Sequence, residues 1–262
     1  MSARPDPNLP FTDPNSIVRT IWGNADTILL VFAGSAAEFA LNRAVDWLFY
    51  TGKVPNDPIG RLFATARFAR DIVFADAAAA QRTLDRINTI HRALEQQRQQ
   101  TIPDWAHRDV LYMLIDYSER AYRLLHRPLT DTEQTELYAV FLRVGQGLQI
   151  PELPATYAAW QQDRQRHLEQ NLEHSHYTTT LYQQYRRHLG ARRYRLLLHI
   201  QTLLVPERVR DLLHLRSTTP LAWTLRLYPV VNRLKLRPLL QRLLIPKQHL
   251  AEVRQLDAAA FA

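Results

Sequence analysis

Two short segments of the chain combine residue types and spacings that could hold a buried metal-containing group. The first, residues 57–65, places Arg61 and Thr65 four positions apart, on one face of a predicted helix. The second, residues 87–94, places His91 in step with neighbouring leucines and an isoleucine, at the spacing of an inward-facing helical stripe. An imidazole there could be a metal ligand, with the Arg/Thr pair supporting a buried cofactor. From the residues alone, the commoner case is a core histidine satisfied by one hydrogen bond.

The elements that position these residues are helices. Cap residues and hydrophobic periodicity predict helices along almost the whole chain. Asp57-Pro58 and Asp76 begin the two helices in question, which should end near Phe74 and Gln97. We predict further helices over 13–22, 25–50 (with a kink at Gly34-Ser35), 104–125, 130–147, 155–172, 177–189, 191–204, 206–215, 220–243 and 247–258. No strand-like alternation or solenoid repeat is present. The sequence therefore predicts an all-α, single-domain helical bundle.

The bulk composition indicates a globular chain with a sizeable core. Of its 262 residues, 46% are hydrophobic, which is an ordinary value for a folded protein. The chain has no Cys, which excludes disulfides and thiolate-bound metal sites. The segment 1–14 lacks the design of a secretory signal, and the most apolar run, 28–37, is too short to span a bilayer. We therefore expect a soluble, cytoplasmic protein.

The net charge of +8 and the pI of about 10 predict attraction to polyanions. Residues 182–194 combine tyrosines and arginines in a way that could bind single-stranded nucleic acid, but an amphipathic helix pair whose arginines face water is favoured. We therefore predict no nucleic-acid partner. In residues 221–250, cationic residues lie between apolar ones. This pattern is compatible with a helix that lies on an anionic membrane surface. It is equally compatible with a packed helix whose Arg and Lys side chains extend to solvent.

Motifs for nucleotide-dependent or hydrolytic chemistry are absent from the sequence. It contains neither a phosphate-binding glycine loop nor HExxH nor a nucleophile elbow. The densest group of metal-ligand residue types is His167, Glu169, Glu173, His174 and His176. Their spacing matches no metal site and is more typical of a solvated helix face.

Several short motifs follow one another in a characteristic order over residues 13–215. They are Asp57-Pro-x-Gly-Arg61-Leu-x-x-Thr65, Val73-Phe74, Ile90-His91, Leu114-Ile115-Asp116 with Ala121-Tyr122, Arg127-Pro128-Leu129-Thr130 with Glu133, Arg143-Val144-Gly145 with Leu148 to Pro151, and Val205-Pro206 with Leu212-Leu213. In these motifs the chain resembles the bacterial DUF2236 family. That family includes the latex-clearing rubber oxygenases and is related to the fungal membrane oxygenase MpaB, which cleaves a prenyl chain.

The resemblance implies an all-α fold with a globin-like core around haem b. It relates His91 to the proximal iron ligand, and Arg61 and Thr65 to an Arg and a Thr that line the haem pocket. A neutral imidazole can coordinate iron, Arg61 can pair with a haem propionate or polarise bound oxygen, and Thr65 can fix that geometry. We also count Asp116 with the cofactor-binding residues, as a group that orients a His or an Arg of the bundle.

The chain departs from the family at positions that matter for catalysis. Rubber oxygenases have a Lys three residues after the Arg that can cap the iron, whereas Ala64 cannot ligate. The proposed catalytic acid/base of the rubber enzymes has no aligned counterpart, although Glu38 and Asp46 lie nearby in the sequence. The resemblance therefore supports haem binding more strongly than carbon–carbon cleavage.

The resemblance therefore implies a haem b-dependent oxygenase or oxidoreductase with Arg61 and Thr65 as catalytic residues. Its partners would be dioxygen and an apolar substrate, such as an isoprenoid or a lipid. Two alternatives are a non-catalytic haem carrier or sensor, and a membrane-surface protein with an empty pocket. We expect a disordered segment over residues 1–12, the helical oxygenase domain over 13–215, and basic apolar helices over 216–262. These last helices would pack on the same domain and provide peripheral membrane contact.

Overall fold

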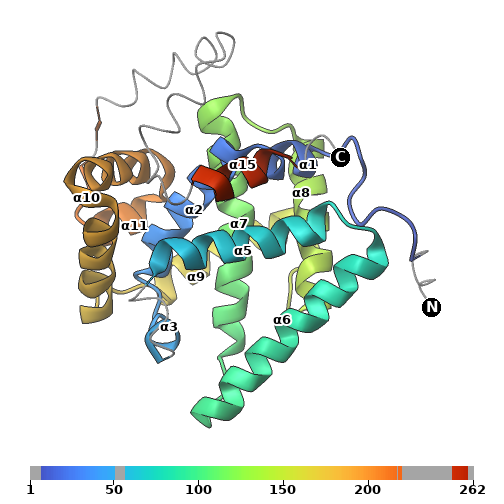
Figure 1. Ribbon diagram of the computed structural model, residues 1–262, viewed down its shortest axis with the longest axis horizontal. Helices are drawn as coiled ribbons and strands as arrows, with labels where there is room; N and C mark the ends of the chain where they lie inside the picture. Colours follow the sequence, from blue (N-terminus) through green and yellow to red (C-terminus); the bar gives the residue numbers. More distant parts are fainter. Residues whose placement is uncertain (1–6, 51–56, 217, 220–249, 259–262) are drawn as a thin grey trace.

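The fold is all-α, as the sequence predicts. The computed structural model describes residues 7–50, 57–216, 218–219 and 250–258, and within these ranges it contains helices and two isolated β-bridges but no strand. The helices are α1 (Ile17–Trp22), α2 (Ala25–Phe39), α3 (Asp46–Tyr50), α5 (Pro58–Val73), α6 (Ala77–Arg98), α7 (Asp104–Leu125), α8 (Asp131–Gly147), α9 (Tyr157–Gln170), α10 (His176–Leu204), α11 (Glu207–Leu212) and α15 (Leu250–Ala258) (Figure 1).

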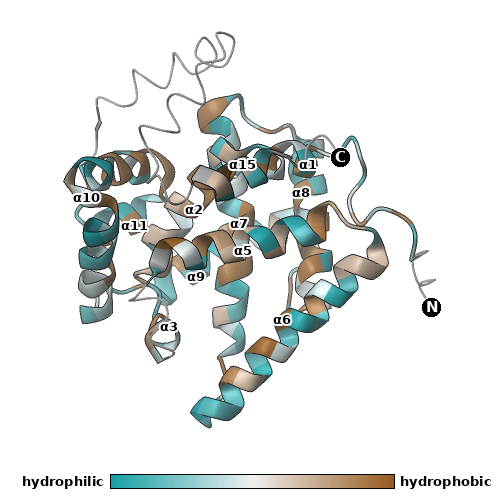
Figure 2. Ribbon diagram, in the orientation of Figure 1, coloured by the Kyte–Doolittle hydropathy of each residue, from teal (hydrophilic) through white to brown (hydrophobic). Residues whose placement is uncertain are grey.

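Helix α7 runs through the centre of the fold, and α2 packs along it (Figure 1). The two helices approach closely at Gly34, where an added Cβ would lie 2.2 Å from the Tyr117 ring. Tyr117 is fully buried, together with Trp22 and Tyr112. Helix α5 packs against α6, and both helices carry apolar and polar residues in turn, which is typical of amphipathic helices with one buried face (Figure 2).

The single helix predicted over residues 25–50 is wrong, because the chain leaves the helical path after Phe39. The segment 40–45 pairs with the chain near Leu172 instead, through an antiparallel bridge at Asn42. The Asn42 amide also donates to Asp109 at 2.7 Å, and its oxygen accepts from the Ala44 N–H at 2.9 Å. These tertiary hydrogen bonds replace the helical ones, and Gly34 serves close packing rather than a kink.

Helix α1 begins later than its sequence predicts. Asp13 accepts from the Asn15 N–H at 2.8 Å, which makes a turn rather than a helix cap. Ser16 is the actual N-cap, because its hydroxyl accepts from the Val18 N–H. The N-cap predicted at Asp13 therefore lies three residues before the actual one. The sequence does not distinguish the two cases, since an Asp side chain accepts from a nearby backbone N–H both in a turn and at a helix cap.

The central helices match their sequence predictions closely. Asp57, Asp76 and Thr130 cap α5, α6 and α8, and Thr130 forms the predicted capping box with Glu133. The predicted helices 177–189 and 191–204 are two arms of α10, which is broken at Gly190 (φ 73°, ψ 165°). A left-handed backbone of this kind favours glycine, which has no Cβ to clash.

Both ends of the described chain are held against the helices. Residues 7–12 lie beside the turn before α6, where the Phe11 N–H donates to the Ala75 carbonyl at 2.9 Å. At the other end, α15 packs on α2 and α5 and buries Val253 and Leu256. Its Asp257 accepts from the Ala25 N–H at 2.8 Å, at the start of α2. The described part of the predicted region 216–262 thus packs on the core.

Two sequence predictions fall outside the described residues. The helix predicted over 220–243 is one, and most of the basic apolar segment 221–250 is the other. Among the helices that the structure does describe, none combines the length and the apolar character needed to cross a bilayer.

Candidate functional site

A cavity of about 700 Å³ lies among α2, α5, α6, α7, α8 and α10. Cofactor and small-molecule pockets commonly measure roughly 300–1,000 Å³, with mostly apolar walls and a few placed polar groups. Apolar side chains form most of this wall too. The polar and charged residues that line it are Asp26, Ser35, Asn42, Arg61, Thr65, His91, His107, Tyr185 and Arg193.

Exposed apolar residues mark the opening of the cavity. Ile90 on α6 is 44% exposed and Val110 on α7 is 38% exposed, yet both line the cavity. Arg61 on α5 is exposed and lines it as well. The cavity therefore reaches solvent near these side chains, and an apolar molecule would meet apolar groups at its mouth.

His91 lines this cavity from α6, with Ile87 and Leu94 of the same helical face. Its ring lies 5.0 Å from the His107 ring, centroid to centroid. Burial, and then the nearby His107 and Arg61, lower the pKa of His91 to about 4. The imidazole is therefore neutral at pH 7, which is the form that binds a metal. No hydrogen bond to this ring is found within the described ranges, so the satisfied core histidine is not observed.

The predicted Arg61/Thr65 pair also lines the cavity, together with Ala64 between them. Asp57 positions this stretch by accepting from the Gly60 N–H at 2.9 Å, which fixes the first turn of α5. The Thr65 hydroxyl donates to the Arg61 carbonyl at 3.2 Å. The Thr65 oxygen can therefore only accept a further hydrogen bond from a bound group.

The structure brings His91, Arg61 and Thr65 to one cavity but leaves Asp116 outside its wall. Asp116 is buried and accepts from Arg120 at 2.6 Å and from Arg164 at 3.0 Å. Burial alone would raise the pKa of Asp116, but the two arginines outweigh it and lower that pKa. Asp116 thus forms hydrogen bonds with two arginines of the bundle and is not among the residues that line the cavity.

The two acidic residues considered as acid/base groups do not line the cavity either. Glu38 is 1% exposed and accepts two hydrogen bonds from Arg164, at 2.5 and 2.6 Å. Asp46 pairs with Arg98 at 2.5 Å. Both carboxylates are therefore committed to ion pairs.

Several polar lining residues were not singled out as site residues from the sequence, and His107 and Arg193 are two of them. His107 had a usable signal, because residues 107, 110, 111 and 114 recur at helical spacing, and all four line the cavity. Arg193 had none, because it belongs to a run of arginines expected to face water. Arg186, Arg187 and Arg192 are indeed exposed, whereas Arg193 is half-buried and lines the cavity.

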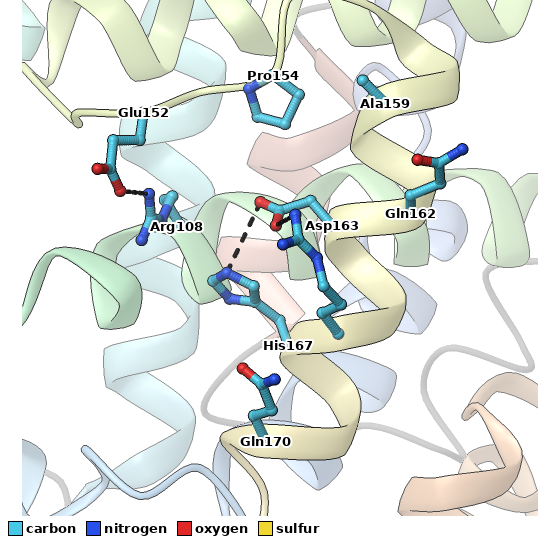
Figure 3. A pocket seen from close by; sticks show the side chains of 9 residues that line it. Arg108, Glu152, Pro154, Ala159, Gln162, Asp163, His167 and Gln170 are labelled. Carbon is cyan, nitrogen blue, oxygen red and sulfur yellow. Dashed lines mark hydrogen bonds and ion pairs between the residues drawn. The ribbon is translucent and has the colours of Figure 1, made fainter.

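A second, polar pocket of about 500 Å³ lies beside α9 and involves His167 (Figure 3). Its charged groups face one another: Arg108 contacts Glu152 at 2.6 Å, and the His167 Nε2 atom lies 3.7 Å from Asp163. The other ring nitrogen of His167 bonds to the buried Asp109. Across the described ranges, no three His, Asp or Glu side chains are grouped as a metal site.

The fold and the cavity define an all-α protein with a largely apolar cavity between its helices, of the size that cofactor and small-molecule pockets have. The family model described as ER-bound oxygenase mpaB/B'/Rubber oxygenase, catalytic domain, matches residues 22–234. The chain therefore belongs to this oxygenase family, and the match includes every residue that lines the cavity. No curated protein and no solved structure matches the chain.

Proposed function

We propose that the chain is a haem b-dependent oxygenase that uses dioxygen on an apolar substrate, such as an isoprenoid or a lipid. The observation that carries this proposal is the convergence of His91, Arg61 and Thr65 on one largely apolar cavity. These are the residues that the family resemblance relates to a haem pocket. Membership of an oxygenase family supports the same activity.

The residues present fit an iron porphyrin. His91 offers a neutral imidazole without a competing hydrogen bond in the described chain, and the apolar wall suits the faces of a macrocycle. Arg61, exposed at the mouth, suits a propionate that reaches towards water. Haem b, when bound, would supply the oxygen chemistry, and the chain would supply the ligand, the orientation and the exclusion of water.

Arg61 and Thr65 have complementary roles in this proposal. The guanidinium can only donate hydrogen bonds, so it would hold an anionic or polarised oxygen. The Thr65 oxygen, whose proton is directed to the α5 backbone, can accept from a donor that enters beside it. The apolar mouth at Ile90 and Val110 would admit a hydrocarbon substrate.

An absorption spectrum of the full chain reconstituted with haemin tests the proposal. We expect a Soret band for the wild type and its loss or displacement in His91→Ala. His174→Ala is the matched control, because His174 is exposed and does not line the cavity. A Soret band that is the same in all three proteins would remove His91 from the ligand role.

A non-catalytic haem carrier or sensor is the second candidate function. It is favoured by Ala64, which lines the cavity at the position where the rubber oxygenases have a Lys, and by the placement of Glu38 and Asp46 outside the wall. Oxygen consumption by the haem-loaded protein with isoprenoid or lipid substrates separates the two. Substrate-dependent uptake supports the oxygenase, and its absence with a normal Soret band supports the carrier.

We further propose that the protein works in the cytoplasm and contacts membranes peripherally through its basic C-terminal region. The net charge of +8 supports this contact. Co-sedimentation with anionic liposomes that weakens as salt is added would agree with it, whereas salt-independent or absent binding would not.

A further inference from the structure

Arg193 places a positive charge on the wall of a largely apolar cavity. It follows the break of α10 at Gly190, which redirects the second arm of that helix. Leu189, Leu196 and Leu197 line the cavity beside it. Arg193 is therefore set among apolar side chains, unlike Arg192, its exposed neighbour on the same arm.

Among the described residues, no acidic side chain pairs with the Arg193 guanidinium. Its Nε atom is buried and makes no hydrogen bond, and no ion pair to Arg193 is found in the ranges that the structure describes. A buried donor of a charged group without a partner costs free energy, because it has lost its water and gained nothing in exchange. A hydrogen-bond acceptor from outside the described residues would satisfy the buried Nε atom of Arg193.

The missing acceptor has a definite chemistry. A guanidinium presents its N–H groups in a planar fork that matches the two oxygens of a carboxylate. In an apolar cavity, such an ion pair is shielded from water, so the cavity favours a ligand that carries a carboxylate over one that lacks it. The wall is largely apolar and carries the Arg193 charge, so a ligand that matches it has a large apolar body and one carboxylate.

We propose that Arg193 binds a carboxylate carried by the molecule that occupies the cavity. Two molecules have this chemistry: the porphyrin, through a propionate, and an amphipathic substrate, such as a long-chain acid. The porphyrin source rests on the proposed function, whereas the substrate source requires only the cavity.

Binding measurements on the full chain test this assignment. Arg193→Met keeps most of the length and apolar volume but removes the charge, and Arg193→Lys keeps the charge. Arg192→Met is the matched control on an exposed position of the same helix. The circular dichroism spectrum and melting temperature of each variant establish that it is folded before binding is compared.

The first pair of probes is haemin and its dimethyl ester, followed by the Soret band. The second pair is cis-parinaric acid and its methyl ester, followed by fluorescence in the haem-free protein. We expect R193M to weaken one of the two acids by about 10- to 100-fold, since hydrogen bonds to charged groups have that order of strength. The matching ester and R192M should be unaffected, and R193K should restore part of the affinity.

Each outcome decides the assignment. A loss confined to haemin identifies a propionate as the partner, and a loss confined to parinaric acid identifies a substrate carboxylate. If R193M leaves both acids unchanged, or weakens acids and esters alike, Arg193 does not bind a carboxylate. A wild type that binds no haemin but shows the acid-specific loss with parinaric acid would overturn the proposed haem function and leave this inference standing.

Discussion

At His91, two interpretations of the sequence, a core histidine and a cofactor ligand, lead to different structural expectations. A core histidine held for stability would be satisfied by a hydrogen bond, because an unpartnered buried imidazole costs free energy. His91 instead faces a cavity, has its pKa lowered to about 4, and has a ring contact with His107. These features support the proposed role of His91 as a ligand, because a neutral ring nitrogen beside a cavity suits a ligand-binding position.

Glu119 on α7 gives a prediction about pH. Its Oε2 atom accepts from the Tyr157 hydroxyl at 3.1 Å, while Oε1 is buried without a partner in the described structure. Burial raises the pKa of Glu119 from an ordinary 4.5 to about 7. The Tyr157 hydrogen bond opposes this shift, and the nearby Asp116 carboxylate adds to it. Between these values the folded state binds more protons than the unfolded one, so the free energy of unfolding falls as the pH rises through this range.

We therefore expect Glu119→Gln to stabilise the protein at pH 8, by about 2–3 kcal/mol, and to have little effect at pH 4.5. Urea unfolding at both pH values measures the difference. Glu169→Gln on exposed Glu169 should show no such pH dependence. An equal change at both pH values would mean that Glu119 is not protonated in the folded state.

Among the elements, α2, α7 and α9 are joined by one buried ion network. Arg164 of α9 bonds to Glu38 of α2 and to Asp116 of α7, and the Tyr117 hydroxyl also donates to Glu38 at 2.9 Å. Removing one partner of such a network leaves an uncompensated buried charge. We expect Glu38→Ala to lower the free energy of unfolding by roughly 3–5 kcal/mol.

This prediction also distinguishes two roles of Glu38. If Glu38 is structural, Glu38→Ala lowers stability, and the fraction that stays folded still binds haemin with the wild-type Soret position. Denaturant titration and the absorption spectrum measure the two properties separately. A variant of normal stability that binds haemin but consumes no oxygen would instead make Glu38 a catalytic group.

The contact of α2 with α7 gives a second prediction at this scale. A Cβ at Gly34 would lie 2.2 Å from the Tyr117 ring, so the helices must move apart to accept it. We expect Gly34→Ala to destabilise the protein by about 1–3 kcal/mol, because overpacking outweighs the better helix propensity of Ala. Gly147→Ala is a useful comparison, since its Cβ would approach most closely the Cδ1 atom of Leu84, at 2.5 Å, which is the far end of a flexible side chain rather than a ring. A stable G34A protein would show that the helices are less tightly apposed.

How far the sequence predicts these elements depends on whether local or distant partners decide them. Helices α5, α6, α8 and α9 follow from side-chain caps and periodicity, and α7 from periodicity alone, and these signals act within a few residues. The end of α2 does not, because Asn42 bonds to Asp109 across 67 residues of sequence. The site behaves in the same way: His91, Arg61 and Thr65 are found from local motifs, whereas the inward turn of Arg193 depends on a break at Gly190 and on packing against other helices.

In the whole molecule, the cavity lies where helices from most of the chain meet, from α2 near the N-terminus to α10. A molecule bound there would be enclosed by folded helices, and the unfolded chain does not offer such a site. Binding must therefore stabilise the entire fold by mass action, by about 2.7 kcal/mol when the free ligand is at 100 times its Kd.

We accordingly expect haemin to raise the melting temperature of the wild type in a concentration-dependent manner, and to raise that of His91→Ala much less. Scanning calorimetry with increasing haemin measures the shift, and His174→Ala again serves as the control because it is exposed and outside the cavity. The size of the shift reports the affinity without any catalytic assay. If haemin raised the melting temperature of H91A as much as that of the wild type, the porphyrin would be bound without the His91 imidazole, and the interior ligand would have to be sought elsewhere on the cavity wall, with His107 the next imidazole to replace.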